Sequence, residues 1–151
     1  MEAISNASYK IHNVVKCRQE VTYYELKLVL DKLEAYISNC GAKKVANIIT
    51  VTHVLYLDTK VFDVEVFVPI DKAIPSTNEF IYMPKFSLEN CVMTNYNGHP
   101  HLLPVLYSDL YHKAKDMGLE IEPLFYNVLK GDSSLWRIYD FEADVYTAIK
   151  K

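Results

Sequence analysis

An internal repeat is the feature of this sequence that says most about its fold. The two copies lie 77 residues apart, which is the distance from Gly41 to Gly118. The same offset aligns two pairs of leucines and two motifs of aromatic–Asp–apolar–Glu form: Leu26 with Leu103, Leu33 with Leu110, and 62–65 with 139–142. Such a repeat usually folds into two similar halves related by a pseudo-twofold axis, and clefts between repeated units are common ligand sites. We therefore expect Glu65 and Glu142 to take equivalent places.

The first half predicts one helix among three strands. Thr22 and Glu25 have the spacing of a capping box, and Gly41 suits the left-handed position that follows a helix. Apolar residues recur between these signals at helical spacing, so we expect a helix at 22–40. Alternating β-forming residues predict strands at 9–21, 45–56 and 62–70.

The second half repeats this order. It predicts a helix at 99–117, with strands at 87–96, 121–129 and 136–149. The segment 71–86 contains two prolines and predicts a linker that holds a short strand at 79–83. The chain of 151 residues has the length of one domain, 1–151, with repeat halves at about 1–72 and 78–151. The fold class is therefore α+β, with two pseudo-symmetric strand–helix–strand–strand modules, antiparallel sheets and two main helices.

Composition excludes several classes of protein. The formal net charge is −3 and no basic stripe is present, which argues against direct binding of nucleic acid. No apolar run approaches the roughly 20 residues that a membrane-spanning helix needs. The N-terminus shows no signal peptide, and the three cysteines are far apart, as in a reducing compartment. These observations predict a cytoplasmic protein.

Aromatic and acidic residues are the candidates for chemistry. The chain has 12 tyrosines and 6 phenylalanines, which suit either an aromatic core or a pocket lined with rings. Glu65 and Glu142 lie on the strand face opposite the apolar one, where they are either ordinary surface carboxylates or part of an aromatic cleft. In a cleft, a cationic ligand would supply the partner that a buried carboxylate needs. The histidines lack metal-ligand spacing and no glycine-rich phosphate loop is present, so we predict no metal and no cofactor.

The chain resembles the GyrI-like small-molecule-binding domains, whose fold is related to the SOUL type. The resemblance rests on the order and spacing of five segments: 63–70, 96–100, 103–110, 118–127 and 141–142. It implies two strand–helix–strand–strand modules and a groove that binds hydrophobic, often cationic, drug-like molecules. In multidrug-sensing transcription regulators of the BmrR type, this domain follows a DNA-binding motif, so the present sequence looks like a standalone member.

One position departs from the family pattern. The family commonly has Tyr-Glu on the strand after the second helix, and that glutamate meets cationic ligands. This sequence has Tyr126 and Asn127 there, and asparagine carries no charge. The departure puts into question a cation preference at this position and any hydrolytic role that needs a carboxylate there.

The sequence favours a small-molecule-binding protein over an enzyme. We expect Tyr126, Asn127 and Glu142 to make polar contacts with the ligand. The residues expected to line or border the pocket are Phe125, Trp136, Tyr96, Tyr107 and Glu65. The alternatives are a hydrolase of electrophilic, cyclopropane-bearing compounds and a protein that interacts with a partner such as gyrase or a regulator.

Overall fold

The computed structural model describes residues 1–56, 58–131 and 141–151 of the chain. These residues form two compact units. We call Lys10–Phe86 the N-unit, and Met1–Tyr9 together with Ser87–Lys151 the C-unit. The chain passes between the units within two long strands, β1 (Ile4–Thr22) and β4 (Ile81–Gly98). The repeat halves at about 1–72 and 78–151 are defined by sequence and stay a prediction.

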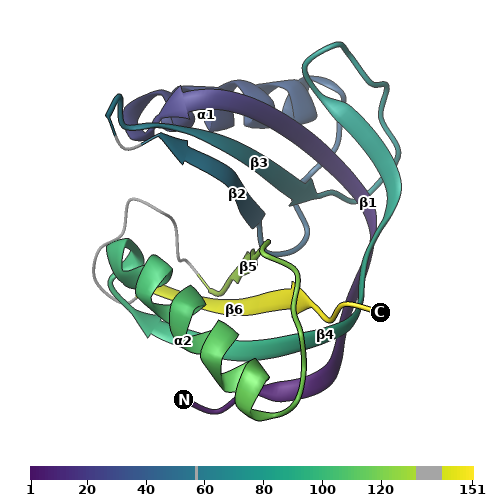
Figure 1. Cartoon of the computed structure of the whole chain (residues 1–151). Coiled ribbons are helices and arrows are strands. Elements are labelled where there is room, and N and C mark those ends of the chain that lie inside the picture. Colours follow the sequence, from purple (N-terminus) through teal and green to yellow (C-terminus); the bar gives the residue numbers. More distant parts are fainter. Residues whose placement is uncertain (57, 132–140) are drawn as a thin grey trace. The chain divides into compact units, whose positions relative to one another are not determined.

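The N-unit has the predicted order of strand, helix, strand and strand. After β1 come α1 (Tyr23–Asn39), β2 (Ile49–Tyr56) and β3 (Val61–Pro69). The middle strand is β3, because it pairs antiparallel with both β1 and β2. Figure 1 shows α1 lying along this sheet. The predicted antiparallel module is therefore present in this unit.

Local signals account for the position of α1. The amide of Glu25 donates to Thr22 Oγ1 at 3.2 Å, and the amide of Thr22 donates to Glu25 Oε1 at 2.9 Å. This is the predicted capping box. Gly41 has a φ of +75°, as expected for the residue that ends a helix in the left-handed region. The predicted apolar stripe is buried, with Leu26 and Leu33 at 1% and 0% exposure.

The C-unit has the same order. After β4 come the short 3₁₀ helix η1 (Pro100–Leu102), α2 (Leu103–Asp116), β5 (Tyr126–Leu129) and β6 (Phe141–Ala148). Here β6 is the middle strand, since it pairs antiparallel with β4 and β5. Figure 1 shows α2 crossing one face of this sheet. The C-unit is thus the second predicted module.

The strand registers correct the predicted equivalence of the two glutamates. In the N-unit Val15 is opposite Val68, and in the C-unit Val92 is opposite Thr147. The first strands are therefore 77 residues apart but the last strands 79. Glu65 is equivalent to Asp144, and Asp63 to Glu142. The prediction that Glu65 matches Glu142 was wrong, because the segment from β5 to β6 is two residues longer than that from β2 to β3.

Several predicted boundaries were also wrong. β4 begins at Ile81, so 81–86 is part of a long strand rather than a linker. Pro84 is exposed in this strand, and proline is tolerated where no ladder hydrogen bond is required of its nitrogen. β1 begins at Ile4, five residues before the predicted strand, and the predicted second helix divides into η1 and α2. Ile121 makes only an isolated bridge to Ile149, so β5 is shorter than predicted.

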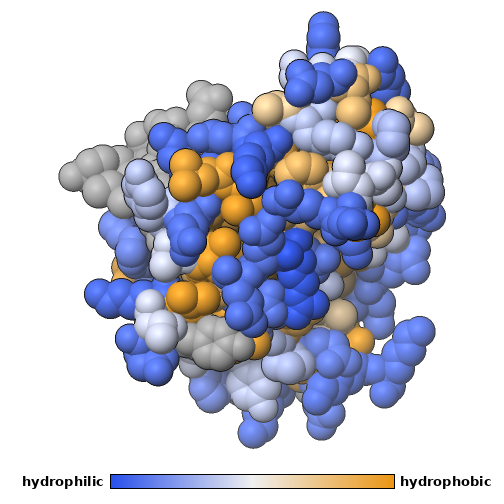
Figure 2. Space-filling view, turned by 90° about the horizontal axis from the view of Figure 1, so that it is seen from above, coloured by the Kyte–Doolittle hydropathy of each residue, from blue (hydrophilic) through white to orange (hydrophobic). Residues whose placement is uncertain are grey.

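The surface of the molecule is mostly hydrophilic on the face that Figure 2 shows, with a group of hydrophobic residues among the polar ones. The exposed large hydrophobic side chains include Tyr24, Leu28 and Val105 on the two helices. In the described part of the chain, no helix is long and apolar enough to cross a membrane.

Candidate functional site

The face of the C-unit sheet that α2 covers holds three of the predicted site residues. The Tyr107 hydroxyl on α2 donates to Asn127 Oδ1 on β5 at 2.7 Å. The Tyr107 ring stacks on that of Phe125, with centroids 4.4 Å apart and planes 6° apart. Asn127 is only 3% exposed. Burial raises the pKa of Tyr107 above its ordinary value, and the hydrogen bond to Asn127 only partly opposes this. These three residues therefore form a cluster that joins α2 to β5.

The opposite face of the same sheet gathers tyrosines and carboxylates. The register places Tyr126 opposite Tyr146 and Val128 opposite Asp144, and directly opposed residues share a face. Glu142 lies on this face too, because it is two residues from Asp144. The Tyr9 ring contacts that of Tyr146, with centroids 5.9 Å apart. Adjacent residues of a strand point to opposite faces, so Tyr126 and Asn127 are separated by the sheet.

Hydrogen bonds connect the carboxylates on this face. Asn95 Nδ2 donates to Glu142 Oε2 at 2.8 Å and to Asp144 Oδ1 at 3.0 Å. Lys130 Nζ donates to Asp144 Oδ2 at 3.1 Å. The Asp144 side chain is 18% exposed and that of Lys130 41%. We call the whole group the tyrosine–carboxylate face; its members are Tyr9, Asn95, Tyr126, Lys130, Glu142, Asp144 and Tyr146.

The electrostatics of this face favour positive charge. Burial, and then the charge of Asp144, raises the pKa of Tyr146. Burial also raises the pKa of Tyr9, where Lys130 opposes the effect and Asp144 adds to it. The hydrogen bond to Asp144 raises the pKa of Lys130. Phenols therefore stay neutral and Lys130 stays charged here, beside carboxylates that accept hydrogen bonds.

The N-unit has a matching polar cluster around Glu65. Arg18 Nε and Nη2 donate to Asp63 Oδ1 and Oδ2 at 3.0 and 2.9 Å. His53 Nε2 lies 3.0 Å from Glu65 Oε1, and Lys16 Nζ lies 3.7 Å from Glu65 Oε2. The side-chain hydrogen bond from Arg18 holds the pKa of Asp63 below its ordinary value. Glu65 is therefore surrounded by cationic groups and a histidine.

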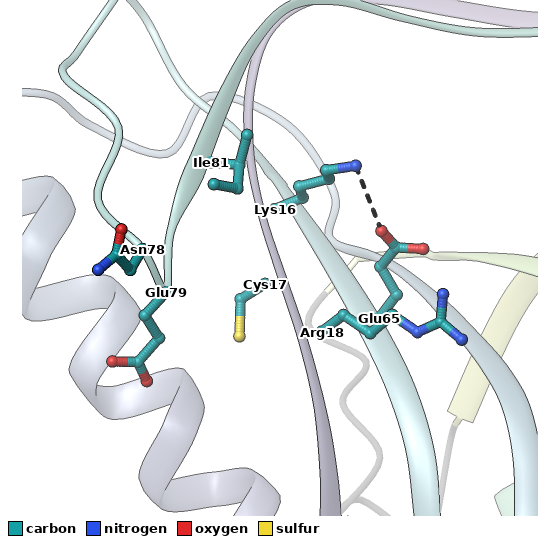
Figure 3. Close-up of a pocket in the computed structure, with 7 residues that line it drawn as sticks. All are labelled: Lys16, Cys17, Arg18, Glu65, Asn78, Glu79 and Ile81. Carbon is teal, nitrogen blue, oxygen red and sulfur yellow. Dashed lines mark ion pairs between the residues drawn. The ribbon is translucent and has the colours of Figure 1, made fainter.

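A pocket of about 260 Å³ lies beside this cluster. Figure 3 shows Lys16, Arg18 and Glu65 on one side of it, with Cys17 and Glu79 on the other. Burial raises the pKa of Cys17 to about 11, and Glu79 and Glu65 add to the shift. The thiol is therefore protonated at neutral pH, which does not suit a nucleophile.

A second pocket, of about 490 Å³, lies in the C-unit. Residues of the N-terminal segment, β4 and α2 line it, including Met1, Asn95, Tyr96 and Leu106. Tyr96 is opposite Ala143 in the sheet, so its side chain lies on the face that also carries Asn127. Its hydroxyl donates to the carbonyl of His99 at 2.6 Å. Tyr96 thus borders this pocket rather than the tyrosine–carboxylate face.

The structure sorts the predicted site residues into separate groups. Three lie together under α2: Tyr107, Phe125 and Asn127. Tyr126 and Glu142 share the other face of that sheet, Tyr96 borders the second pocket, and Glu65 lies in the N-unit. Trp136 lies outside the described residues. That these residues bind a ligand, in a cleft between two repeat halves, stays a prediction.

Sequence reasoning missed several members of the tyrosine–carboxylate face. They are Tyr9, Asn95, Lys130, Asp144 and Tyr146. Two-residue alternation from Glu142 could have found Asp144 and Tyr146. Asn95 and Lys130 could not be found this way, because their contacts depend on strand pairing. Among residues 1–56, 58–131 and 141–151, no group of three or more His, Cys, Asp or Glu side chains could hold a metal ion.

No protein-family model matches the chain, and no curated protein matches it by sequence. Solved structures do match. The EcmrR C-terminal domain has 15% identity and a TM-score of 0.72, over 100% of this chain and 99% of that one. A hydrolase from Listeria innocua has 10% identity and a TM-score of 0.65, over 99% and 91%. SAV2435 bound to tetraphenylphosphonium has 10% identity and a TM-score of 0.51, over 99% and 93%.

These likenesses define the fold. The chain has the α+β, GyrI-like fold, as the sequence predicted. The chain spans 58% of the EcmrR chain in the EcmrR–DNA complex, with 17% identity and a TM-score of 0.69.

Proposed function

We propose that this protein binds hydrophobic organic cations at the tyrosine–carboxylate face of the C-unit. One observation carries the proposal: three tyrosines and two carboxylates, Glu142 and Asp144, share one face of the sheet. The tyrosines supply apolar area and negatively polarised ring faces. The carboxylates supply charge, and they are held in place by Asn95.

The expected energies suit a binding protein. A cation over an aromatic ring gains about 0.5–2 kcal/mol. A carboxylate about 4 Å from a cation adds roughly 4 kcal/mol at an effective dielectric constant near 20. Association and ordering cost several kcal/mol in return. We expect a dissociation constant of about 1–100 µM, or roughly −8 to −5.5 kcal/mol.

The comparison with SAV2435 supports the choice of ligand. That protein shares the fold and is bound to tetraphenylphosphonium, a hydrophobic cation. The same compound is therefore a suitable probe for this chain. Broader binding of drug-like compounds and an aromatic cleft between the repeat halves are further proposals from the sequence.

Calorimetry with two ligands tests the function. Tetraphenylphosphonium carries the charge, whereas triphenylphosphine oxide keeps aromatic rings without net charge. We expect Asp144→Asn to weaken the cation at least fivefold and the neutral compound less than twofold. The matched control is Asp109→Asn, which removes one negative charge from an exposed position on α2 and should leave both affinities unchanged. Absence of cation binding up to 1 mM, roughly −4 kcal/mol, would refute the proposal.

A hydrolase is the second candidate. A solved structure with the same fold is that of a hydrolase from Listeria innocua. A carboxylate and a phenol on one face, such as Asp144 and Tyr146, are also groups that can act as general base and acid. Mass spectrometry of an electrophilic cyclopropane incubated with the protein tests turnover. The Asp144→Asn variant should abolish any turnover found. A gyrase-directed role stays a prediction that a supercoiling assay can test.

A further inference from the structure

The two units carry the same polar arrangement, and one position in it differs in charge. By strand register, Asn95 of the C-unit is equivalent to Arg18 of the N-unit. Each is directly opposite a carboxylate of the middle strand: Arg18 is opposite Glu65, and Asn95 is opposite Asp144. The second carboxylates, Asp63 and Glu142, are equivalent as well. The fold therefore presents the same pair of acids to an arginine in one unit and to an asparagine in the other.

The contacts repeat as well as the positions. Arg18 binds Asp63 through two hydrogen bonds of 3.0 and 2.9 Å. Asn95 binds Glu142 and Asp144 through hydrogen bonds of 2.8 and 3.0 Å. Even the third partner is conserved in place, because His53 contacts Glu65 at 3.0 Å and Lys130, 77 residues later, contacts Asp144 at 3.1 Å.

We infer that the side chain at position 95 determines whether the carboxylates of its unit accept a cationic ligand, an inference that rests on the proposed function. Asparagine donates hydrogen bonds that orient Glu142 and Asp144 but adds no charge. Arginine at the equivalent position 18 binds its acid in a bidentate, charge-assisted pair. A ligand cation at the N-unit acids would have to compete with that fixed guanidinium.

A second difference points the same way. Lys16 approaches Glu65 at 3.7 Å in the N-unit. The residue 77 positions later is Met93, which is uncharged and lies on the same face as Tyr146, its register partner. The N-unit therefore places two side-chain cations, Lys16 and Arg18, where the C-unit has a thioether and an amide. Glu142 makes contacts besides that with Asn95, so the inference concerns the charge at position 95 and not the isolation of Glu142.

The aromatic residues differ in the same direction. Tyr126 and Tyr146 of the C-unit are equivalent by register to Ile49 and Phe67 of the N-unit. The N-unit positions thus keep apolar character but lack the tyrosine pair. Charge and aromatic content together favour the C-unit as the cation-binding unit.

The test converts the C-unit position to its N-unit counterpart. We expect Asn95→Arg to weaken tetraphenylphosphonium binding at least tenfold and triphenylphosphine oxide binding less than threefold. The side chain at position 95 is exposed and its counterpart is already arginine, so the fold should accept the change. Ser108→Arg adds the same charge at an exposed position of α2 and is the control for long-range repulsion. Its affinity for the cation should stay within twofold of the wild-type value.

The outcomes separate this inference from the proposed function. If the wild-type protein does not bind the cation, the proposed function fails and the inference fails with it. If the wild-type protein binds and Asn95→Arg binds equally well, the inference alone is overturned. Equal losses for Asn95→Arg and Ser108→Arg would also overturn it, since net charge would then be the cause. Thermal unfolding of each variant identifies misfolding, and Asn95→Lys, with the same expected loss, replaces Asn95→Arg if the latter does not fold.

Discussion

Removing the Tyr107 hydroxyl should destabilise the C-unit without disturbing its aromatic packing. Tyr107→Phe keeps the ring that stacks on Phe125 at 4.4 Å and deletes only the donor to Asn127. Asn127 is 3% exposed, so water cannot readily replace that donor. Weakening the satisfaction of a buried polar group costs about 1–3 kcal/mol. We expect a loss of about 1.5 kcal/mol in the free energy of unfolding.

Urea denaturation and thermal unfolding measure this loss. For a chain of this length, 1 kcal/mol shifts the melting temperature by roughly 2–4 °C, so we expect a decrease of about 3–6 °C. Tyr111→Phe is the matched control, because Tyr111 is on the same helix and 49% exposed. That variant should change the free energy by less than about 0.5 kcal/mol, as exposed substitutions usually do.

A double-mutant cycle isolates the hydrogen bond. Asn127→Leu also loses the other contacts of Asn127, but the cycle cancels them. We expect a coupling free energy of about 1 kcal/mol between Tyr107→Phe and Asn127→Leu. Additive losses, or a Tyr107→Phe variant as stable as Tyr111→Phe, would refute the reasoning that this bond joins α2 to β5.

Three further predictions concern the N-unit. Because Arg18 lowers the pKa of Asp63, the stabilisation from Asp63 is present above its unfolded pKa of about 3.9 and is lost as the pH falls through the folded value. Asp63→Asn should therefore flatten the loss of thermal stability between pH 5 and about pH 3, while Asp31→Asn on the exposed side of α1 should not. Thr22→Ala should lower the free energy of unfolding by about 1 kcal/mol in urea denaturation, since it removes the cap of α1; an unchanged midpoint would contradict this. With its pKa raised to about 11, Cys17 should react with iodoacetamide at pH 7.5 much more slowly than the less buried Cys40, as mass spectrometry can show; equal rates would count against burial of the thiol.

Much of the fold could be predicted because its signals are local. The capping box at Thr22 and the glycine at position 41 placed the ends of α1 to within a residue. Two-residue alternation assigned the strand faces correctly. Even the wrong offset for the last strand left Glu142 on the correct face, because the error was two residues and the side-chain period of a strand is two.

Boundaries and equivalences failed where they depend on distant residues. The linker predicted at 71–86 overlooked the start of β4 at Ile81, since the sequence of 81–86 has a proline and does not reveal its strand partners. The equivalence of Glu65 with Asp144 follows from which residues face one another across two strands. That register is a non-local property and cannot be read from a single segment.

The sequence by itself determined the two helices, the antiparallel strand order of each module and the face on which each strand residue points, because caps and periodicity act within a few residues. Only the tertiary structure decided which sheet face α2 covers, and so whether Asn127 or Tyr126 is buried beneath a helix. It also decided that Asn95 spans Glu142 and Asp144 while Arg18 binds Asp63. The physical reason is that these contacts join strands far apart in the chain, and their geometry exists only once the sheet has formed.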